Sequence, residues 1–102
     1  MEYFFNIKNE TTEEEIDLFL YSMFEQKIMV VLNINLVGYT ESFFNLIKFK
    51  KILDKYRNYS KEYIDHTNVL INNQLVVLIL QTILTIFQPE RPVLIEFKEY
   101  FN

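Results

Sequence analysis

Any acid–base chemistry in this chain would have to start from its only histidine. His66 follows Asp65 near the start of a predicted strand, and an imidazole beside a carboxylate can act as an acid–base pair. No nucleophile motif accompanies the two residues. Adjacent side chains of a strand point to opposite faces, so we expect that Asp65 does not orient His66. The pattern therefore favours an exposed histidine at a strand end over a catalytic one.

No motif indicates a site for a metal ion, a phosphate or a cofactor. The densest acidic cluster is Glu13, Glu14, Glu15 and Asp17, which fans around a predicted helix, and its first three carboxylates complement the helix dipole. No spacing matches a calcium loop or a zinc site. The chain has no cysteine and one glycine, which excludes disulfides, thiolate ligands and glycine-rich phosphate-binding loops. We therefore expect a protein that is not an enzyme, without catalytic residues, cofactors or metal ions.

Composition limits the function classes further. Half of the 102 residues are hydrophobic and 24% are charged, which suits one soluble folded domain. The net charge of −4 argues against general nucleic-acid binding, which depends on neutralising phosphates. Residues 1–5 lack the features of a signal peptide, and no segment is long and apolar enough to cross a bilayer, so we expect a cytoplasmic protein. The absence of alanine and the many Asn, Ile, Lys, Phe and Tyr residues are the bias of an AT-rich genome, such as that of some viruses.

Hydrophobic periodicity predicts the elements that would position a site. Residues 3–8 alternate as a short strand. Thr12 and Glu15 have the spacing of a capping box at the start of a helix with one apolar stripe. Residues 28–36 are predicted as a central strand, because their continuous apolar start indicates burial on both faces.

Four more elements are predicted in the second half of the chain. Residues 43–58 form a helix with its lysines facing outward, and residues 63–72 contain a strand. Residues 75–87 form a mostly buried helix, because the polar positions share one helical face. Residues 93–97 alternate as a last strand at a sheet edge. The order βαβαβαβ predicts a single small α/β domain over residues 1–102, with about four mostly parallel or mixed strands.

The charges are distributed unevenly along the chain. Six of the ten basic residues fall between positions 48 and 61, and six of the fourteen acidic residues fall between positions 10 and 25. Two solvated helix faces would explain this distribution, and so would a docking surface for a partner.

The turn between the central strand and the basic helix reads Gly38-Tyr39-Thr40-Glu41-Ser42. Together with the order of elements, it resembles the STAS domain (sulfate transporter and anti-sigma factor antagonist), in which a central strand ends in a turn reading Asp-Ser-Ser/Thr-Gly that opens a helix. Glu41-Ser42 occupies the place of the family's Asp-Ser, and Phe43-Phe44 stands where the family has a small residue and glycine. The resemblance covers residues 27–97 and implies a STAS-like fold.

The resemblance also implies a function. STAS domains are non-enzymatic regulators that dock a protein partner, often a kinase or a sensor, around this turn, and phosphorylation of a serine there switches docking. We therefore expect partner binding by the turn 38–45 and the basic helix 43–58, with Ser42 as the phosphorylated residue and Thr40 as the alternate. The expected partner-binding residues are Tyr39, Thr40, Glu41, Ser42, Lys48, Lys51 and Lys55. A phosphate at Ser42 would add about −1.5 to −2 charges at a helix N-terminus, which favours anions. The alternative role for Thr40 or Ser42 is that of a plain helix cap.

Two other functions stay open at the level of sequence. One is a structural or accessory homodimeric subunit that pairs through an aromatic surface of Tyr3, Phe4, Tyr39, Tyr100 and Phe101. The other is a peripheral module on anionic membranes that uses the cations of the basic helix, which are Lys48, Lys50, Lys51, Lys55 and Arg57.

Overall fold

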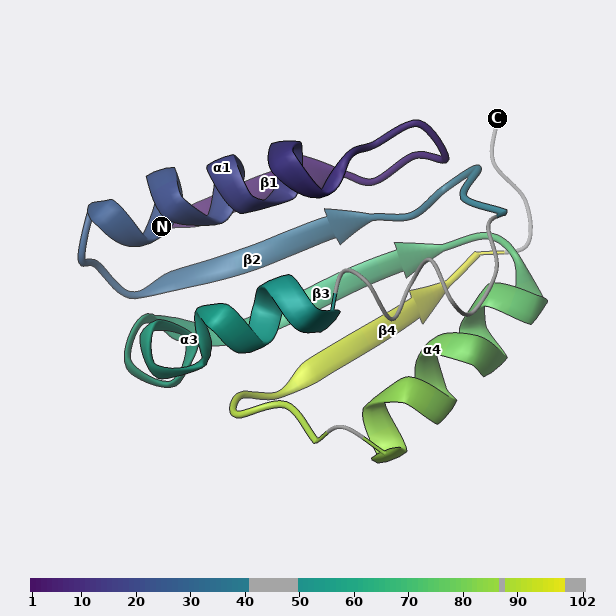
Figure 1. The fold of residues 1–102 in the computed structure, drawn as a ribbon. Helices are drawn as coiled ribbons and strands as arrows, with labels where there is room; N and C mark the ends of the chain where they lie inside the picture. Colours follow the sequence, from purple (N-terminus) through teal and green to yellow (C-terminus); the bar gives the residue numbers. More distant parts are fainter. Residues whose placement is uncertain (41–49, 87, 99–102) are drawn as a thin grey trace.

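The computed structural model describes residues 1–40, 50–86 and 88–98. Its strands and labelled helices are β1 (Glu2–Asn6), α1 (Glu13–Glu25), β2 (Val30–Asn35), α3 (Arg57–Tyr63), β3 (Ile64–Ile71), α4 (Gln74–Ile86) and β4 (Val93–Phe97), as shown in Figure 1. The strands form one sheet in the order β1-β2-β3-β4, and all three neighbouring pairs are parallel. The predicted α/β class is confirmed, with β2 inside the sheet and β4 at an edge.

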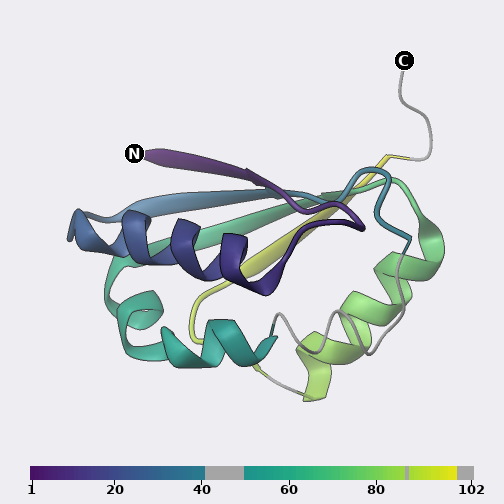
Figure 2. The ribbon, with the colours of Figure 1, turned by 45° about the horizontal axis from the view of Figure 1, so that its top comes forward.

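The order of the strands determines where the helices lie. Each connection moves to the next strand in the same direction, and parallel crossovers almost always have the same hand, so the helices are placed on one side of the sheet. Figure 2 shows α1, α3 and α4 on this covered face. No described helix lies on the opposite side, which we call the open face. Sheets made only of parallel strands usually have both faces covered, so this bare side is the unusual feature of the fold.

The core lies between the covered face and the helices. α1 begins at Thr12, whose hydroxyl oxygen accepts a hydrogen bond from the backbone N–H of Glu15 at 3.1 Å, so the predicted cap is confirmed. The buried stripe of α1 and the covered-face residues of β2 and β3 belong to one apolar cluster, which includes Leu20, Leu32 and Ile71. Burying each such side chain stabilises the fold by about 1.5–3 kcal/mol.

The basic stretch forms two helical segments instead of one. Residues 50–55 are helical, Tyr56 interrupts them with φ −103° and ψ 19°, and α3 follows, so the prediction that the helix ends by Asn58 is wrong. The rings of Tyr56 and Tyr59 lie 5.6 and 5.8 Å from the ring of Phe24 in α1. These contacts hold the chain in helical form beyond the polar residues that look like a terminator. The first part of the predicted helix lies outside the described residues.

Two burial predictions are also wrong. β2 is not buried on both faces, because its alternating end places Asn33 and Asn35 on the open face. α4 has the predicted length but is not mostly buried. It contacts β3 and β4 at one side of the sheet, where Val76 and Ile83 are buried, and its opposite side is exposed.

Candidate functional site

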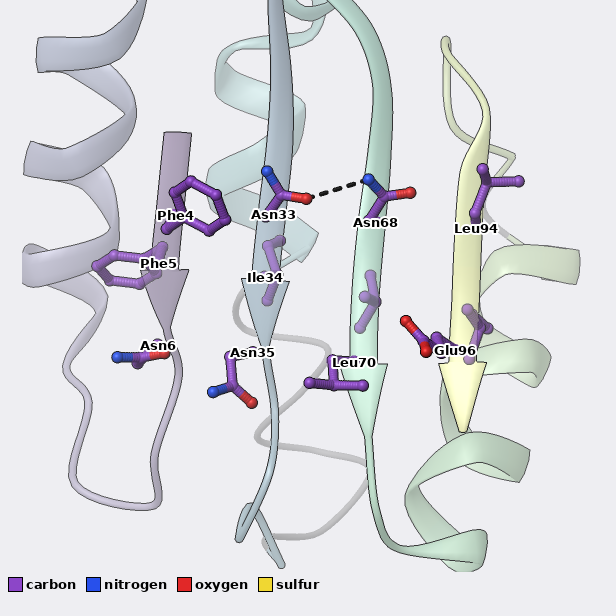
Figure 3. Close-up of a pocket in the computed structure, with 12 residues that line it drawn as sticks. Phe4, Phe5, Asn6, Asn33, Ile34, Asn35, Asn68, Leu70, Leu94 and Glu96 are labelled. Atoms are coloured by element: carbon purple, nitrogen blue, oxygen red, sulfur yellow. Dashed lines mark hydrogen bonds between the residues drawn. The ribbon is translucent and has the colours of Figure 1, made fainter. Parts of the chain in front are cut away.

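The open face brings side chains of all four strands together. The strand register places Phe4, Asn33, Asn68 and Leu94 in one row across the sheet. The next row consists of Asn6, Asn35, Leu70 and Glu96. Figure 3 shows both rows, which line a shallow depression with a volume of about 480 Å³. The site is therefore a product of the parallel register rather than of a loop.

A network of carboxamides crosses the middle of the open face. The amide nitrogen of Asn68 donates to the side-chain oxygen of Asn33 at 3.0 Å. The amide nitrogen of Asn33 in turn lies 3.3 Å from a carboxylate oxygen of Glu2 and 3.3 Å from the carbonyl oxygen of Tyr3. Because these bonds join β1, β2 and β3, the carboxamides in the first row are held in fixed orientations.

Both rows have hydrogen-bonding groups that no described residue satisfies. The side-chain oxygen of Asn35 accepts from the backbone N–H of Val37 at 2.9 Å. Within the described residues, no hydrogen bond involves the amide nitrogen of Asn35, the side-chain oxygen of Asn68 or the side chain of Asn6. A carboxamide offers both donors and acceptors, so the depression presents both kinds of group to a ligand.

Apolar side chains stand at both sides of these carboxamides. Phe4 on β1 is 71% exposed and Leu94 on β4 is 55% exposed, and Figure 3 shows them at opposite sides of the Asn33–Asn68 pair. Large apolar groups exposed beside ordered polar groups are typical of contact surfaces. The arrangement suits an elongated ligand that lies on the carboxamides between two apolar walls.

The histidine lies at the beginning of the same face. β2 and β3 shift register there, because Val30 pairs with Ile64 and Val31 pairs with His66, which leaves Asp65 as an extra residue. Such a bulge changes the direction of the side chains. The imidazole Nδ1 lies 2.7 Å from a carboxylate oxygen of Asp65, so our expectation that Asp65 does not orient His66 is wrong.

The imidazole ring of His66 also contacts a neighbouring asparagine. The imidazole Nε2 of His66 lies 3.5 Å from the amide nitrogen of Asn68, so the ring joins the carboxamide network. No group of three or more metal-ligating side chains occurs among the described residues. The arrangement can orient hydrogen bonds at the margin of the open face.

The turn after β2 is placed differently from the prediction. Tyr39 is 1% exposed and belongs to the core, so a partner cannot reach this predicted docking residue in the folded chain. Thr40 is exposed, and two hydrogen bonds of 2.9 Å join it to Asn9 in the loop after β1. Glu41 and Ser42 lie outside the described residues. Thr40 therefore links the loop after β2 to the loop after β1 at the carboxyl end of the sheet.

Two of the three predicted docking lysines, Lys51 and Lys55, lie in the described chain, four positions apart on the helical residues 50–55. Lys48 lies outside the described residues, and Lys51 is exposed. Lys55 forms an ion pair with Asp17 of α1 at 3.0 Å. This contact brings the basic stretch against the acidic helix, so part of the uneven charge distribution is neutralised inside the molecule.

Carboxylates also pair with other cations of the basic stretch. Asp54 pairs with Lys50 and, at 3.2 Å, with Arg57. The hydrogen bond from Lys50, followed by that from Arg57, holds the pKa of Asp54 below its ordinary value. Arg57 also pairs with Glu90 at 2.8 Å. These pairs leave the membrane alternative with fewer uncompensated cations than the sequence indicates, and no helix among the described residues is long and apolar enough to span a bilayer.

The described aromatic residues of the surface predicted for a homodimer do not lie on one face of the molecule. Tyr3 faces the covered side, where its ring lies 6.4 Å from the ring of Phe19, and Tyr39 is in the core. Tyr100 and Phe101 lie outside the described residues. Of the predicted set, Phe4 is the described side chain that is fully available for contact.

A second cavity lies on the covered side. Its volume is about 190 Å³, and its lining includes Leu32, Val69 and Ile83, with Arg57 and Glu90 also contributing. The lining is mostly aliphatic, so this cavity offers packing surface with few directed hydrogen bonds. The open face has the stronger combination of polar and apolar groups.

The important residues that the sequence analysis missed are asparagines. Asn33 and Asn35 alternate with apolar residues in β2, and Asn68 sits in the middle of β3. Asparagine is depleted in strands, so its repeated presence at alternate positions is a signal that one face of the sheet is not buried in the core.

No family model, curated protein or solved structure matches this chain. The resemblance to STAS domains therefore stays a prediction.

Proposed function

We propose that the protein is a non-enzymatic interaction module that binds an extended, positively charged segment of a partner protein on its open face. The observation that carries this proposal is a parallel sheet with helices on one face and none, among the described residues, on the other. The exposed Phe4 and Leu94 add apolar surface that a partner would remove from water.

The spacing of the carboxamides supports an extended ligand. Asn33 and Asn35 are two residues apart on β2, which corresponds to about 6.6 Å along a strand. An extended peptide repeats its own backbone groups at the same interval. A peptide lying along β2 can therefore meet successive carboxamides with successive backbone N–H and C=O groups, while Phe4 and Leu94 contact its side chains.

The charges around the open face support a basic ligand. Glu96 lines the depression, and Glu2 lies beside it, within 3.3 Å of Asn33. Lys98 pairs with Glu96 at 3.4 Å, and the guanidinium of Arg91 lies 3.3 Å from the carbonyl oxygen of Asp65 at the beginning of the face. Glu2 and Glu96 would give a basic ligand two carboxylates beside the carboxamides. Charge complementarity would accelerate the association of a partner with Lys or Arg side chains and would disfavour an acidic one.

The interaction class agrees with what the STAS resemblance implies, whereas the surface differs. Docking by the turn 38–45 and the helix 43–58, and phosphorylation of Ser42 or Thr40, stay predictions. Phosphorylation of Thr40 would turn the oxygen that accepts from Asn9 into an ester oxygen and would place about −1.5 to −2 charges beside the link between the two loops.

A library of linear dodecapeptides displayed on phage tests the proposal. We expect selection on the wild-type protein to enrich sequences that contain Lys or Arg. For a selected peptide made synthetically, Phe4→Ala and Asn35→Ala should each weaken binding by about tenfold or more, as measured by calorimetry. Leu78→Ala on α4 is a matched control, because Leu78 is also exposed, and it should leave the affinity unchanged.

Two results would contradict the proposal. One is a selection that yields no enriched sequence or mainly acidic sequences. The other is an enriched peptide whose affinity is insensitive to both Phe4→Ala and Asn35→Ala, because such a peptide would bind elsewhere.

A further inference from the structure

The outer side of α4 is a second surface without a partner in the described chain. Leu75, Leu78 and Ile86 are 64%, 61% and 60% exposed. With Thr82 they follow at intervals of three, four and four residues, which places them on one stripe of the helix. α4 contains no charged residue, so this stripe, which we call the α4 seam, has no charge along its whole length.

The threonines of α4 make this side less polar than its sequence indicates. The hydroxyl of Thr82 donates to the carbonyl oxygen of Leu78 at 2.8 Å, and the hydroxyl of Thr85 donates to the carbonyl oxygen of Gln81 at 2.9 Å. Each hydroxyl is satisfied within the helix. Thr82 therefore needs no polar partner across a contact, and an apolar surface can cover it at little cost in hydrogen bonding.

Charge decides between the possible occupants of the α4 seam. Peripheral membrane helices combine an apolar side with Lys and Arg, and α4 has neither of these cations. A symmetric contact between two copies brings each residue close to its own symmetry mates, so a charged surface repels itself. The open face carries the carboxylates of Glu2 and Glu96, whereas the α4 seam carries no charged side chain.

We propose that two copies of the chain associate through the α4 seam, with the two helices antiparallel around a two-fold axis. This arrangement places Leu75 opposite Ile86 of the partner subunit and Leu78 opposite Thr82 of the partner subunit. Gln81 is exposed beside the middle of the seam, and its carboxamide can pair with Gln81 of the partner subunit because a carboxamide is both donor and acceptor.

The size of the surface determines the strength of the dimer. A helix of 13 residues is about 20 Å long. One such pair cannot by itself bury the roughly 800 Å² per partner of a standard interface. We therefore expect a reversible dimer with a dissociation constant on the order of micromolar, seen as a concentration-dependent mass.

Sedimentation velocity over a concentration series tests this inference. The wild-type protein should shift from monomer to dimer as its concentration rises through the micromolar range. Leu78→Glu should raise the dissociation constant by at least about tenfold, because it places two carboxylates in the contact. Leu94→Glu is the matched control: it puts the same change on an exposed leucine of the open face and should leave dimer formation unchanged.

Cross-linking gives a second readout that does not depend on destabilising the contact. The chain has no cysteine, so Leu78→Cys and Leu94→Cys each introduce a single reactive thiol. A bismaleimide reagent should join two Leu78→Cys chains into a covalent dimer and should leave Leu94→Cys monomeric.

Three outcomes would overturn the inference. The first is a wild-type protein that stays monomeric at every concentration. The second is a dimer that Leu78→Glu does not weaken, and the third is efficient cross-linking of Leu94→Cys in place of Leu78→Cys. Wild-type protein that is monomeric but sediments with phosphatidylcholine vesicles would assign the seam to lipid and would also refute the dimer. None of these results bears on the peptide selection, so the two proposals can fail separately.

Discussion

Tyr56 is the residue that joins the basic stretch to the acidic helix most closely. Its hydroxyl donates to the carboxylate of Asp17, and Lys55 donates to the same carboxylate at 3.0 and 3.2 Å. The hydrogen bond from Tyr56, followed by that from Lys55, holds the pKa of Asp17 below its ordinary value. Burial, followed by the bond to Asp17, raises the pKa of Tyr56 to about 12. A neutral tyrosine is therefore favoured in the folded state.

Replacing this tyrosine should have a pH-dependent effect on stability. Tyr56→Phe removes one hydrogen bond to a charged group and should lower the free energy of unfolding by about 1 kcal/mol at neutral pH. Because the folded-state pKa is raised from 10.0 to about 12, the stabilisation is complete below pH 10 and is lost as pH rises to about 12. Urea denaturation should therefore show wild-type and variant converging over this range.

Tyr59→Phe is the control for that measurement. Tyr59 contacts the same ring of Phe24 but is 48% exposed. Its replacement should change stability little, and it should not remove the alkaline loss seen in the wild type. Equal alkaline behaviour of wild type and Tyr56→Phe would show that the phenol does not contribute to stability in the way described.

Within the sheet, we expect the pair formed by Asn33 and Asn68 to contribute to the proposed peptide binding more than to stability. One hydrogen bond of 3.0 Å joins the two carboxamides, and exchanging both for apolar groups removes its donor and its acceptor at once, which is often neutral. The exchange also removes the two 3.3 Å contacts of the Asn33 amide nitrogen with Glu2 and with the carbonyl oxygen of Tyr3. Valine also suits a strand better than asparagine does. Asn33→Val/Asn68→Val should therefore fold at least as stably as the wild type in urea denaturation, and should bind a selected peptide at least about tenfold more weakly.

The single exchanges separate this explanation from a general effect of polarity. Asn68→Val alone removes the amide that donates a hydrogen bond to the side-chain oxygen of Asn33. The single variant should therefore be less stable than the double variant. A double variant that is markedly less stable than wild type, or that binds peptide normally, would contradict the functional assignment of the pair.

Elements that depend on local pattern were predicted well from the sequence. Thr12 and Glu15 define the start of α1 within a few residues, and the alternation of residues 93–97 defines β4. Features that depend on pairing between distant residues were not. Asp65 is the extra residue of a bulge because it has no partner residue in β2. Asn33 contacts Asn68 because β2 and β3 align two residues that are 35 positions apart in the sequence. Neither relation has a local signal, so the open face required the strand order and register.

At the scale of the whole molecule, the two proposed surfaces differ in charge and lie on different sides of the sheet. The open face carries carboxylates and carboxamides, whereas the α4 seam is uncharged and is on the covered side, facing away from the strands. We expect each surface to disfavour the ligand proposed for the other surface. A basic peptide gains nothing from an uncharged helix, and a second copy would bring carboxylates together on the open face.

Because the surfaces share no residue, peptide binding and dimer formation should be thermodynamically independent. Coupling between two sites is reciprocal, so either experiment measures it. Leu78→Glu, which is expected to be monomeric, should bind a selected peptide with the wild-type dissociation constant, and Asn33→Val/Asn68→Val should dimerise as the wild type does. Calorimetry at protein concentrations below and above the dimer transition measures the first, and sedimentation with saturating peptide measures the second. A change in either constant of about tenfold or more would show that both ligands bias a common conformational element, most directly β3, which contributes Asn68 to the open face and contacts α4 on the covered side.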